Sequence, residues 1–269
     1  MLRRAHFLLI SIVKHKYFTT VVLLLGVMLF SGCATTGGAN GKDANSFETH
    51  DPYENINRKS YVFTDVIDRK ILEPISDYYV RFVPNPMRRS IGHFYDNLLY
   101  PNVFVNAFLQ GKMRQGVEDT LRFVVNSSVG VAGLFDVASR MGLPAHDEDF
   151  GQTLGVWGMD AKTYLFIPLL GPSTDRDVSG IPFAAVVHPM FWIGWFVVGA
   201  PVTVPITVLG VVEKRARLSG PMRIRDEAAL EPYLFVRDAY LQQRKHLIYD
   251  GNPPPEVYED PAEEVISLR

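Results

Sequence analysis

Residues 183–212 read FAAVVHPMFWIGWFVVGAPVTVPITVLGVV and lie in a stretch, 178–212, without Asp, Glu, Lys or Arg. As one helix, these 30 residues would extend about 45 Å, enough to cross a bilayer with a hydrocarbon core of about 30 Å. Prolines interrupt the run, and an interior proline kinks or ends a helix. The sequence therefore predicts an apolar hairpin over about 183–212 rather than one spanning helix. The four prolines are Pro182, Pro189, Pro201 and Pro205.

The limb between Pro189 and Pro201 has the length of one membrane leaflet. Its eleven residues would form a helix of about 17 Å, close to half of the ~30 Å hydrocarbon core. We therefore expect the hairpin to enter one leaflet only. The alternative is a buried core hairpin of a soluble lipoprotein, since Trp and Phe suit either site. The candidate inserted residues are Phe191, Trp192, Trp195, Phe196, Val197 and Val198.

The rest of the body shows a helical period. Apolar residues recur in steps of three and four over 113–127, and every seventh residue from Leu234 to Ile248 is apolar. Residues 53–72 are also compatible with a helix, which we expect to end before Pro74. Strand-like alternation is scarce. The sequence predicts an all-α single domain of amphipathic and broken helices over about 51–249.

The N-terminus has the features of a secretory signal. Basic residues up to Lys16 precede an uncharged stretch, 17–32, that ends before Cys33. Its 16 residues fall short of the ~20 that a spanning helix needs, although a signal anchor is the alternative. We predict a signal peptide over 1–32. Residues 33–50 are rich in small and polar residues and are expected to form a flexible tether, and 250–269 an acidic, disordered tail.

The segment from Leu29 to Cys33 resembles a bacterial lipobox. The resemblance implies cleavage after Gly32 and a diacylglyceryl group on the Cys33 thiol. More than one acyl chain gives stable membrane anchoring, at about 0.8 kcal/mol for each buried CH₂. Ala34 stands where Asp would be the usual signal for retention in the inner membrane, so we expect the outer membrane.

Composition excludes several classes of protein. The hydrophobic share of 47% excludes an intrinsically disordered chain, and 27 basic against 29 acidic residues disfavour a nucleic-acid binder. A single Cys excludes intramolecular disulfides and Cys-based zinc clusters. The sequence has no nucleophile elbow, zinc-protease motif or nucleotide-binding glycine loop, so we expect no enzyme, cofactor or metal. The cluster 146–149, with one His and three acids, is interpreted as a solvated loop.

A few residues are weaker candidates for a passage or a gate. The adjacent Arg176 and Asp177 could form a structural ion pair or a gate. Glycines near them permit either close turns or gating. These glycines are Gly151, Gly155, Gly158 and Gly171.

Five characteristic segments follow one another along the body. They are DPYENINR (51–58), FYDNL (94–98), FGQTLGVWG (150–158), PLLGPST (168–174) and YLFVRDAY (233–240). As an ordered set that covers essentially the whole body, they resemble the MlaA/VacJ family of outer-membrane lipoproteins. Asn55 and Ile56 replace the common Gly-Phe of the family's opening signature.

The resemblance implies a helical, ring- or donut-like protein, monotopic in one membrane leaflet on the periplasmic face. It implies transfer of mislocalised glycerophospholipids from the outer leaflet to a periplasmic lipid carrier, which maintains lipid asymmetry. Some members bind trimeric porins. The helices over 113–127 and 230–249 are expected to form part of the passage wall. Two alternatives stay open, a periplasmic lipid hydrolase and a non-catalytic structural tether or porin companion.

Overall fold

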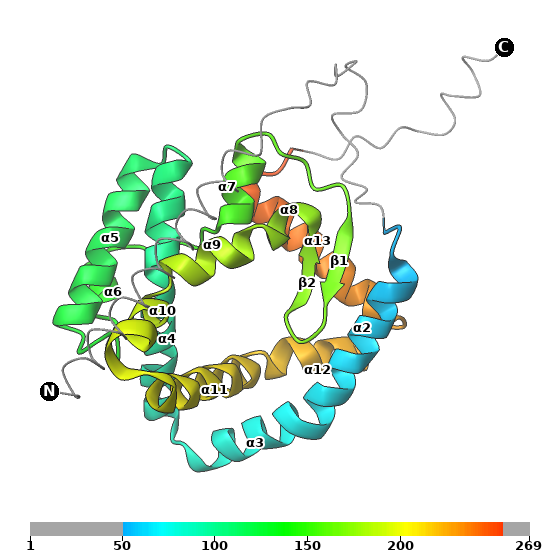
Figure 1. Ribbon diagram of the computed structural model, residues 1–269, viewed down its shortest axis with the longest axis horizontal. Coiled ribbons are helices and arrows are strands. Elements are labelled where there is room, and N and C mark those ends of the chain that lie inside the picture. The colour runs from blue at the N-terminus through cyan, green and yellow to red at the C-terminus, as the bar shows by residue number, and fades with distance from the viewer. Residues whose placement is uncertain (1–50, 255–269) are drawn as a thin grey trace, which may run out of the picture. The chain divides into compact units, whose positions relative to one another are not determined.

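A computed structural model describes residues 51–254 of the chain. The predicted signal peptide and tether, with Cys33, and nearly all of the predicted acidic tail lie outside the described residues. Within the compact unit Ser46–Arg269, the described helices follow one another around a ring (Figure 1). The predicted all-α ring is confirmed, apart from one small β-hairpin.

The first arc of the ring passes through a proline. α2 (Glu54–Ile67) runs into a π-helical turn, η1 (Asp68–Leu72), and then into α3 (Glu73–Phe82). The expectation that the helix ends before Pro74 is therefore wrong. Proline donates no backbone hydrogen bond and crowds the preceding turn, and the wider π turn at this point lets the helix continue.

The next two helices form an antiparallel pair. α4 (Asn85–Leu109) and α5 (Met113–Ser128) are joined by a tight turn in which Gly111 has a φ of 77°. The predicted helix over 113–127 is confirmed. Its apolar stripe points away from the neighbouring helices, because Val117 is 51% and Val124 53% exposed. The buried positions of α5 are Gly116, Asp119, Arg122 and Asn126.

The small β-hairpin differs from the all-α expectation. After the short helices α6 (Val137–Arg140) and α7 (Phe150–Val156), β1 (Tyr164–Ile167) pairs antiparallel with β2 (Gly171–Thr174). Tyr164 and Phe166 of β1 are buried against Tyr233, with ring centroids of Tyr164 and Tyr233 6.1 Å apart. Four residues are too few for their alternation to stand out in a sequence.

The apolar run is broken at two of the four prolines that the sequence analysis names, whereas Pro182 and Pro205 lie inside helices. α8 (Asp175–Val178) leads into α9 (Gly180–Val187), which ends at the extended residue His188. α10 (Pro189–Ile193) and a π-helical turn, η2 (Gly194–Val198), end at Gly199, whose φ is 71°. The breaks thus precede Pro189 and Pro201. The described residues contain no single helix that is long and apolar enough to cross a membrane. The helix pair Asp175–Val187 and Pro189–Val198, bent by 50°, has the length and composition that a broken span needs.

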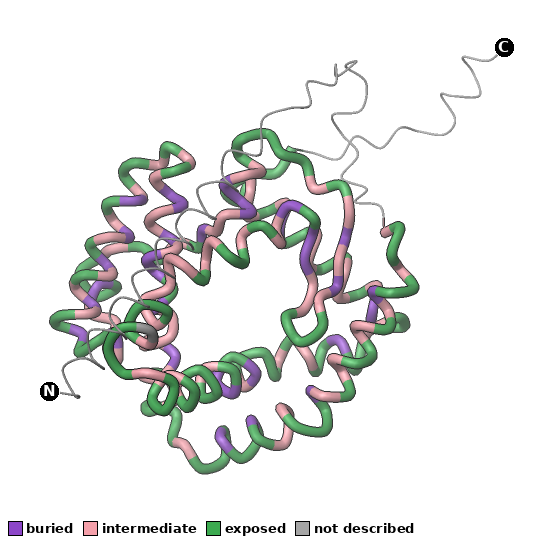
Figure 2. Tube along the Cα trace, viewed as in Figure 1, coloured by how far each residue is buried: buried purple, intermediate pink, exposed green. Residues whose placement is uncertain are grey.

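Three helices close the ring, whose buried residues are mostly polar. α11 (Ala200–Arg217) and α12 (Ser219–Ala228) precede α13 (Pro232–Ile248), which packs on α7 and β2. Among the described residues, 18 polar or charged residues are buried against 10 apolar ones. Figure 2 shows the buried positions as short pieces around the ring rather than one central block. Polar contacts therefore hold many of the joints between helices.

Candidate functional site

The apolar hairpin exposes many of its side chains. Val197 of η2 is 76% exposed and Val204 of α11 is 56% exposed. The two limbs meet at Gly194, where a Cβ would lie 2.7 Å from Cγ2 of Thr203, so only glycine allows this approach. Other large apolar residues more than a third exposed along the same run are Ile181, Ile193, Val202, Val208, Leu209 and Val211.

The structure brings the predicted insertion residues together on α10 and η2. Phe191, Trp192, Phe196, Val197 and Val198 are all exposed, while the side chain of Trp195 lies outside the described ones. The Trp192 ring stacks on Phe196, with centroids 5.9 Å apart, and its Nε1 donates a hydrogen bond of 2.6 Å to the carbonyl of Val186. This bond holds α10 against α9 across the bend at His188.

A buried ionic cluster joins α13 to α7 and α8. Nη2 of Arg244 donates to Oδ1 of Asp149 at 3.0 Å and to Oδ1 of Asp177 at 2.9 Å. Arg176 contacts the same Asp177 oxygen at 3.0 Å, and the Tyr240 hydroxyl donates to the other oxygen at 2.7 Å. The side chains of Arg244 and Asp177 are only 9% and 8% exposed. We call these five residues the latch cluster.

Electrostatics in the latch cluster favour a charged Asp177 and a neutral Tyr240. Burial alone would raise the pKa of Asp177, but Arg244, Arg176 and the Tyr240 hydroxyl together lower it. Burial and the neighbouring Asp177 carboxylate raise the pKa of Tyr240, which stays a hydrogen-bond donor. The predicted Arg176–Asp177 pair is thus part of a larger ion-pair network.

The candidate glycines divide into two groups. A Cβ at Gly151 would lie 2.3 Å from Oδ1 of Asp177, and one at Gly155 would lie 3.0 Å from Nη1 of Arg176. Both glycines therefore leave the space that the latch cluster fills. Gly158 lies in the turn after α7 and Gly171 begins β2. Nothing lies within 4 Å of a Cβ at either position, and both are outside that cluster.

Polar clusters that the sequence does not reveal join other parts of the ring. The amide of Asn57, 2% exposed, donates to the Tyr164 carbonyl at 3.1 Å and accepts from the Phe166 N–H at 2.9 Å, which ties α2 to β1. Arg215 of α11 contacts Asp68 of η1 at 2.6 Å. The opening motif at 51–58 is the only signal for the first cluster, and nothing local indicates the second.

The loop at 146–149 is only partly solvated, with Asp147 exposed. Glu148 is 3% exposed and accepts hydrogen bonds of 2.8 Å from Lys112 and Gln115. His146 contacts Asp119 at 3.0 Å. The polar ends of α4 and α5 provide partners that a solvated loop would lack. Within 51–254, no group of three or more His, Cys, Asp or Glu is placed to hold a metal ion.

The described residues contain no hydrogen bond between a Ser or Thr hydroxyl and a histidine. His146 is bonded to Asp119, and His188 accepts the Met190 N–H at 3.2 Å. Ser139 instead bonds Asp136, where its contacts and those of Asn126 and Arg122 outweigh burial and lower the pKa of the carboxyl to about 2. These polar groups contact other side chains and backbone groups within the fold.

Comparisons with known proteins agree with this arrangement. A family model described as "MlaA lipoprotein" matches residues 49–247. The chain is 32% identical over 239 residues to the Escherichia coli (strain K12) "Intermembrane phospholipid transport system lipoprotein MlaA", covering 87% of this chain and 90% of that protein. The Haemophilus influenzae protein of the same name is 33% identical over 229 residues, covering 83% and 89%.

A solved structure is also similar. It is described as "Structural basis for maintenance of bacterial outer membrane lipid asymmetry". It matches with a TM-score of 0.63 and 32% identity, covering 76% of this chain and 100% of that chain.

Proposed function

Because this chain belongs to the MlaA lipoprotein family, we propose that its helical ring conducts phospholipid between an outer-membrane leaflet and the periplasm. The chain is a component of phospholipid transport that maintains the lipid asymmetry of the outer membrane. In the proposed mechanism it stands on the periplasmic face, anchored through Cys33. It passes mislocalised glycerophospholipids to a soluble lipid carrier.

One observation carries this proposal: large apolar side chains are exposed while many polar ones are buried between the helices. The stripe on α5 and the hairpin on α9, α10, η2 and α11 are exposed, whereas 18 polar or charged residues are buried. Contiguous exposed apolar surface of this kind is typical of membrane contact. The exposure favours seating in a leaflet over the alternative of a buried core hairpin.

The same arrangement lowers a physical barrier to lipid movement. A phospholipid head group is charged, and moving it through hydrocarbon is expensive unless polar partners accompany it. Helices with exposed apolar side chains and polar contacts between them offer both kinds of surroundings at once. No covalent change of the lipid is needed, so we propose a transport component and not an enzyme.

Deletion of the gene is the direct test of the transport function. We expect phospholipid to accumulate in the outer leaflet, measured by labelling intact cells with a reagent that does not cross the membrane. Complementation with the wild-type chain should restore the low level. An unchanged level after deletion would favour the structural tether or porin companion instead. Co-purification with trimeric porins, a partner that only the family resemblance implies, is a separate measurement.

Cys33→Ala is expected to leave the protein unanchored. The variant lacks the thiol that would carry the diacylglyceryl group, so it should lose metabolic labelling with palmitate and shift out of the outer-membrane fraction. Thr35→Ala, two residues away, is the matched control and should behave as the wild type. Recovery of an acylated Cys33→Ala protein would rule out this lipidation site.

Incubation with labelled phospholipid tests the hydrolase alternative. We expect the purified chain to release no free fatty acid, because the proposed transport changes no bond in the lipid. A phospholipase measured in parallel confirms that the assay detects release. Fatty acid produced in proportion to the amount of this protein would support an enzyme.

A further inference from the structure

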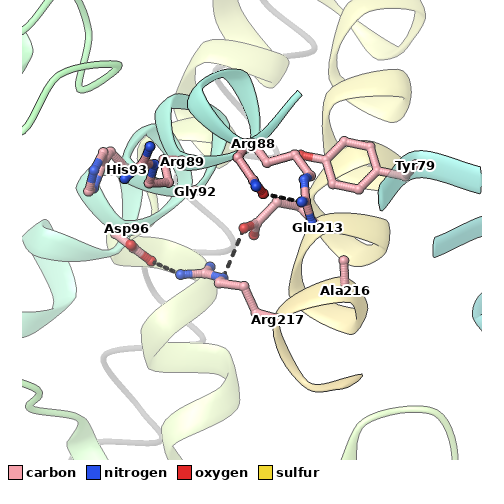
Figure 3. Close-up of a pocket in the computed structure, with 10 residues that line it drawn as sticks. Tyr79, Arg88, Arg89, Gly92, His93, Asp96, Glu213, Ala216 and Arg217 are labelled. Carbon is pink, nitrogen blue, oxygen red and sulfur yellow. Dashed lines mark hydrogen bonds and ion pairs between the residues drawn. The ribbon is translucent and has the colours of Figure 1, made fainter. Parts of the chain in front are cut away.

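A cavity of about 270 Å³ with several charged residues in its lining lies where α3, α4 and α11 meet (Figure 3). Glu213 and Arg217 reach it from α11, and Tyr79 from α3. The α4 residues around it include two further arginines, Arg88 and Arg89. Its volume is below the ~300–1,000 Å³ of sites for drug-sized ligands, which suits a head group and not acyl chains.

Three buried polar atoms in this cavity have no hydrogen-bond partner. The Glu213 side chain is 4% exposed, and its Oε1 accepts from Nε of Arg217 at 3.0 Å, while its Oε2 is unpaired. The Tyr79 hydroxyl and Nε of Arg88 are also buried and unpaired. Folded proteins pair nearly all buried polar atoms, so this concentration points to a polar guest.

The unpaired groups differ in the partner that they need. The guanidinium group of Arg217 already has two carboxylate partners, since its Nη1 contacts Asp96 at 2.7 Å and its Nε contacts Glu213. The remaining carboxylate oxygen of Glu213 requires a donor or a cation. The guanidinium groups of Arg88 and of the exposed Arg89 favour an anion.

We propose that this cavity binds a zwitterion with a phosphate and a primary ammonium group, the chemistry of a phosphoethanolamine head group. Oε2 of Glu213 accepts from the ammonium group, with the Tyr79 hydroxyl beside it, and Arg88 and Arg89 hold the phosphate. A quaternary ammonium has no N–H to donate, so a choline head group leaves Glu213 unpaired. This inference rests on the proposed transport of phospholipid and deepens it by naming a head group.

The close packing around Glu213 supports a preformed site. A Cβ at Gly92 of α4 would lie 3.0 Å from Oε1 of Glu213, so the glycine lets the carboxylate lie directly against α4. Burial raises the pKa of Glu213, with Arg217 opposing the effect, as expected for a carboxylate that lacks a full set of partners. A bound ammonium group would supply the missing partner.

The test compares three soluble probes by calorimetry on the full chain in detergent. They are a short-chain phosphatidylethanolamine, its phosphatidylcholine counterpart, and glycerophosphoethanolamine, which has no acyl chains. We expect the wild type to bind the ethanolamine lipid about tenfold more tightly than the choline lipid, the effect of one charge-assisted hydrogen bond. Binding of glycerophosphoethanolamine identifies a site for the free head group, and binding of the lipid alone identifies a site that also needs chains.

Glu213→Gln should reduce the preference to about equal affinity, with choline binding unchanged. The matched control is Glu227→Gln, which removes the same charge from an exposed position on α12 and should keep the preference. Tyr79→Phe removes only a hydroxyl and is expected to lower ethanolamine binding several-fold without disturbing the fold. Arg88→Gln should weaken both lipids about tenfold, because both have the phosphate.

Equal affinity of the wild type for both lipids, or a preference that survives in Glu213→Gln, would overturn the site and indicate a cavity that holds water only. That result leaves the transport function standing if deletion still raises outer-leaflet phospholipid. Failure of the deletion test overturns the transport function itself, whatever the head-group preference.

Discussion

Replacing Arg244 by alanine is expected to lower the free energy of unfolding by about 3–5 kcal/mol, the typical effect of breaking a buried ion pair. The change would leave the carboxylates of Asp149 and Asp177 without the cation that both contact. Urea unfolding of the purified chain in mild detergent, followed by circular dichroism, measures the effect. Arg223→Ala on the exposed face of α12 is the control and should stay within about 0.5 kcal/mol of the wild type.

The pH dependence separates this ionic effect from simple loss of packing. The lowered pKa of Asp177 stabilises the fold above the unfolded value of about 3.9, and this contribution is lost as the pH falls through the lower folded value. The difference between the wild type and Arg244→Ala should therefore shrink below about pH 4. A difference that stays constant with pH would show that Arg244 acts through packing alone.

Val197→Asp is expected to weaken membrane seating by roughly a hundredfold. An Asp in the hydrocarbon disfavours insertion by about 2.5–3.5 kcal/mol, and each 1.4 kcal/mol is a factor of ten. Val197 is 76% exposed on η2, so the substitution leaves the internal packing intact. Flotation with liposomes measures the effect, using chains that also have Cys33→Ala so that no lipid anchor masks it.

Leu230→Asp provides the matched control for this experiment. Leu230 is a fully exposed apolar residue between α12 and α13, outside the hairpin. We expect its substitution to leave liposome binding unchanged. Equal binding by Val197→Asp and its parent chain would instead favour a hairpin that does not enter the membrane.

The sequence predicts the breaks in the apolar run because proline and glycine act locally. The ends at His188 and Gly199 precede Pro189 and Pro201, as the loss of backbone donors requires. Pro205, in contrast, lies inside α11. A proline pattern therefore locates possible breaks, and the packing decides which of them the chain uses.

The direction in which a helix face points is harder to predict. The stripe on α5 identifies a helix, but periodicity shows only which residues share a face and not what that face contacts. The polar residues Asp119, Arg122 and Asn126 recur in the same helical steps and are the buried ones. This second stripe indicates a helix that packs through its polar face.

The sequence indicates only the adjacent Arg176 and Asp177 of the latch cluster, and it does not indicate the cavity around Glu213. Arg244 lies 67 residues from Asp177 and 95 from Asp149, and no local pattern links such positions. In the sequence, Glu213 only marks the end of the uncharged run. Its burial depends on the packing of α3 and α4 around it. Long-range pairing of charges depends on the closed ring, which local propensities do not specify.

The exposed apolar residues described above also constrain how the protein is made. Exposed apolar surface of this kind favours self-association of the protein in an aqueous compartment. After synthesis, the protein therefore requires a chaperone, or contact with a bilayer before folding is complete. In the absence of lipid or detergent, the yield of purified protein should be limited by aggregation and not by failure to form helices.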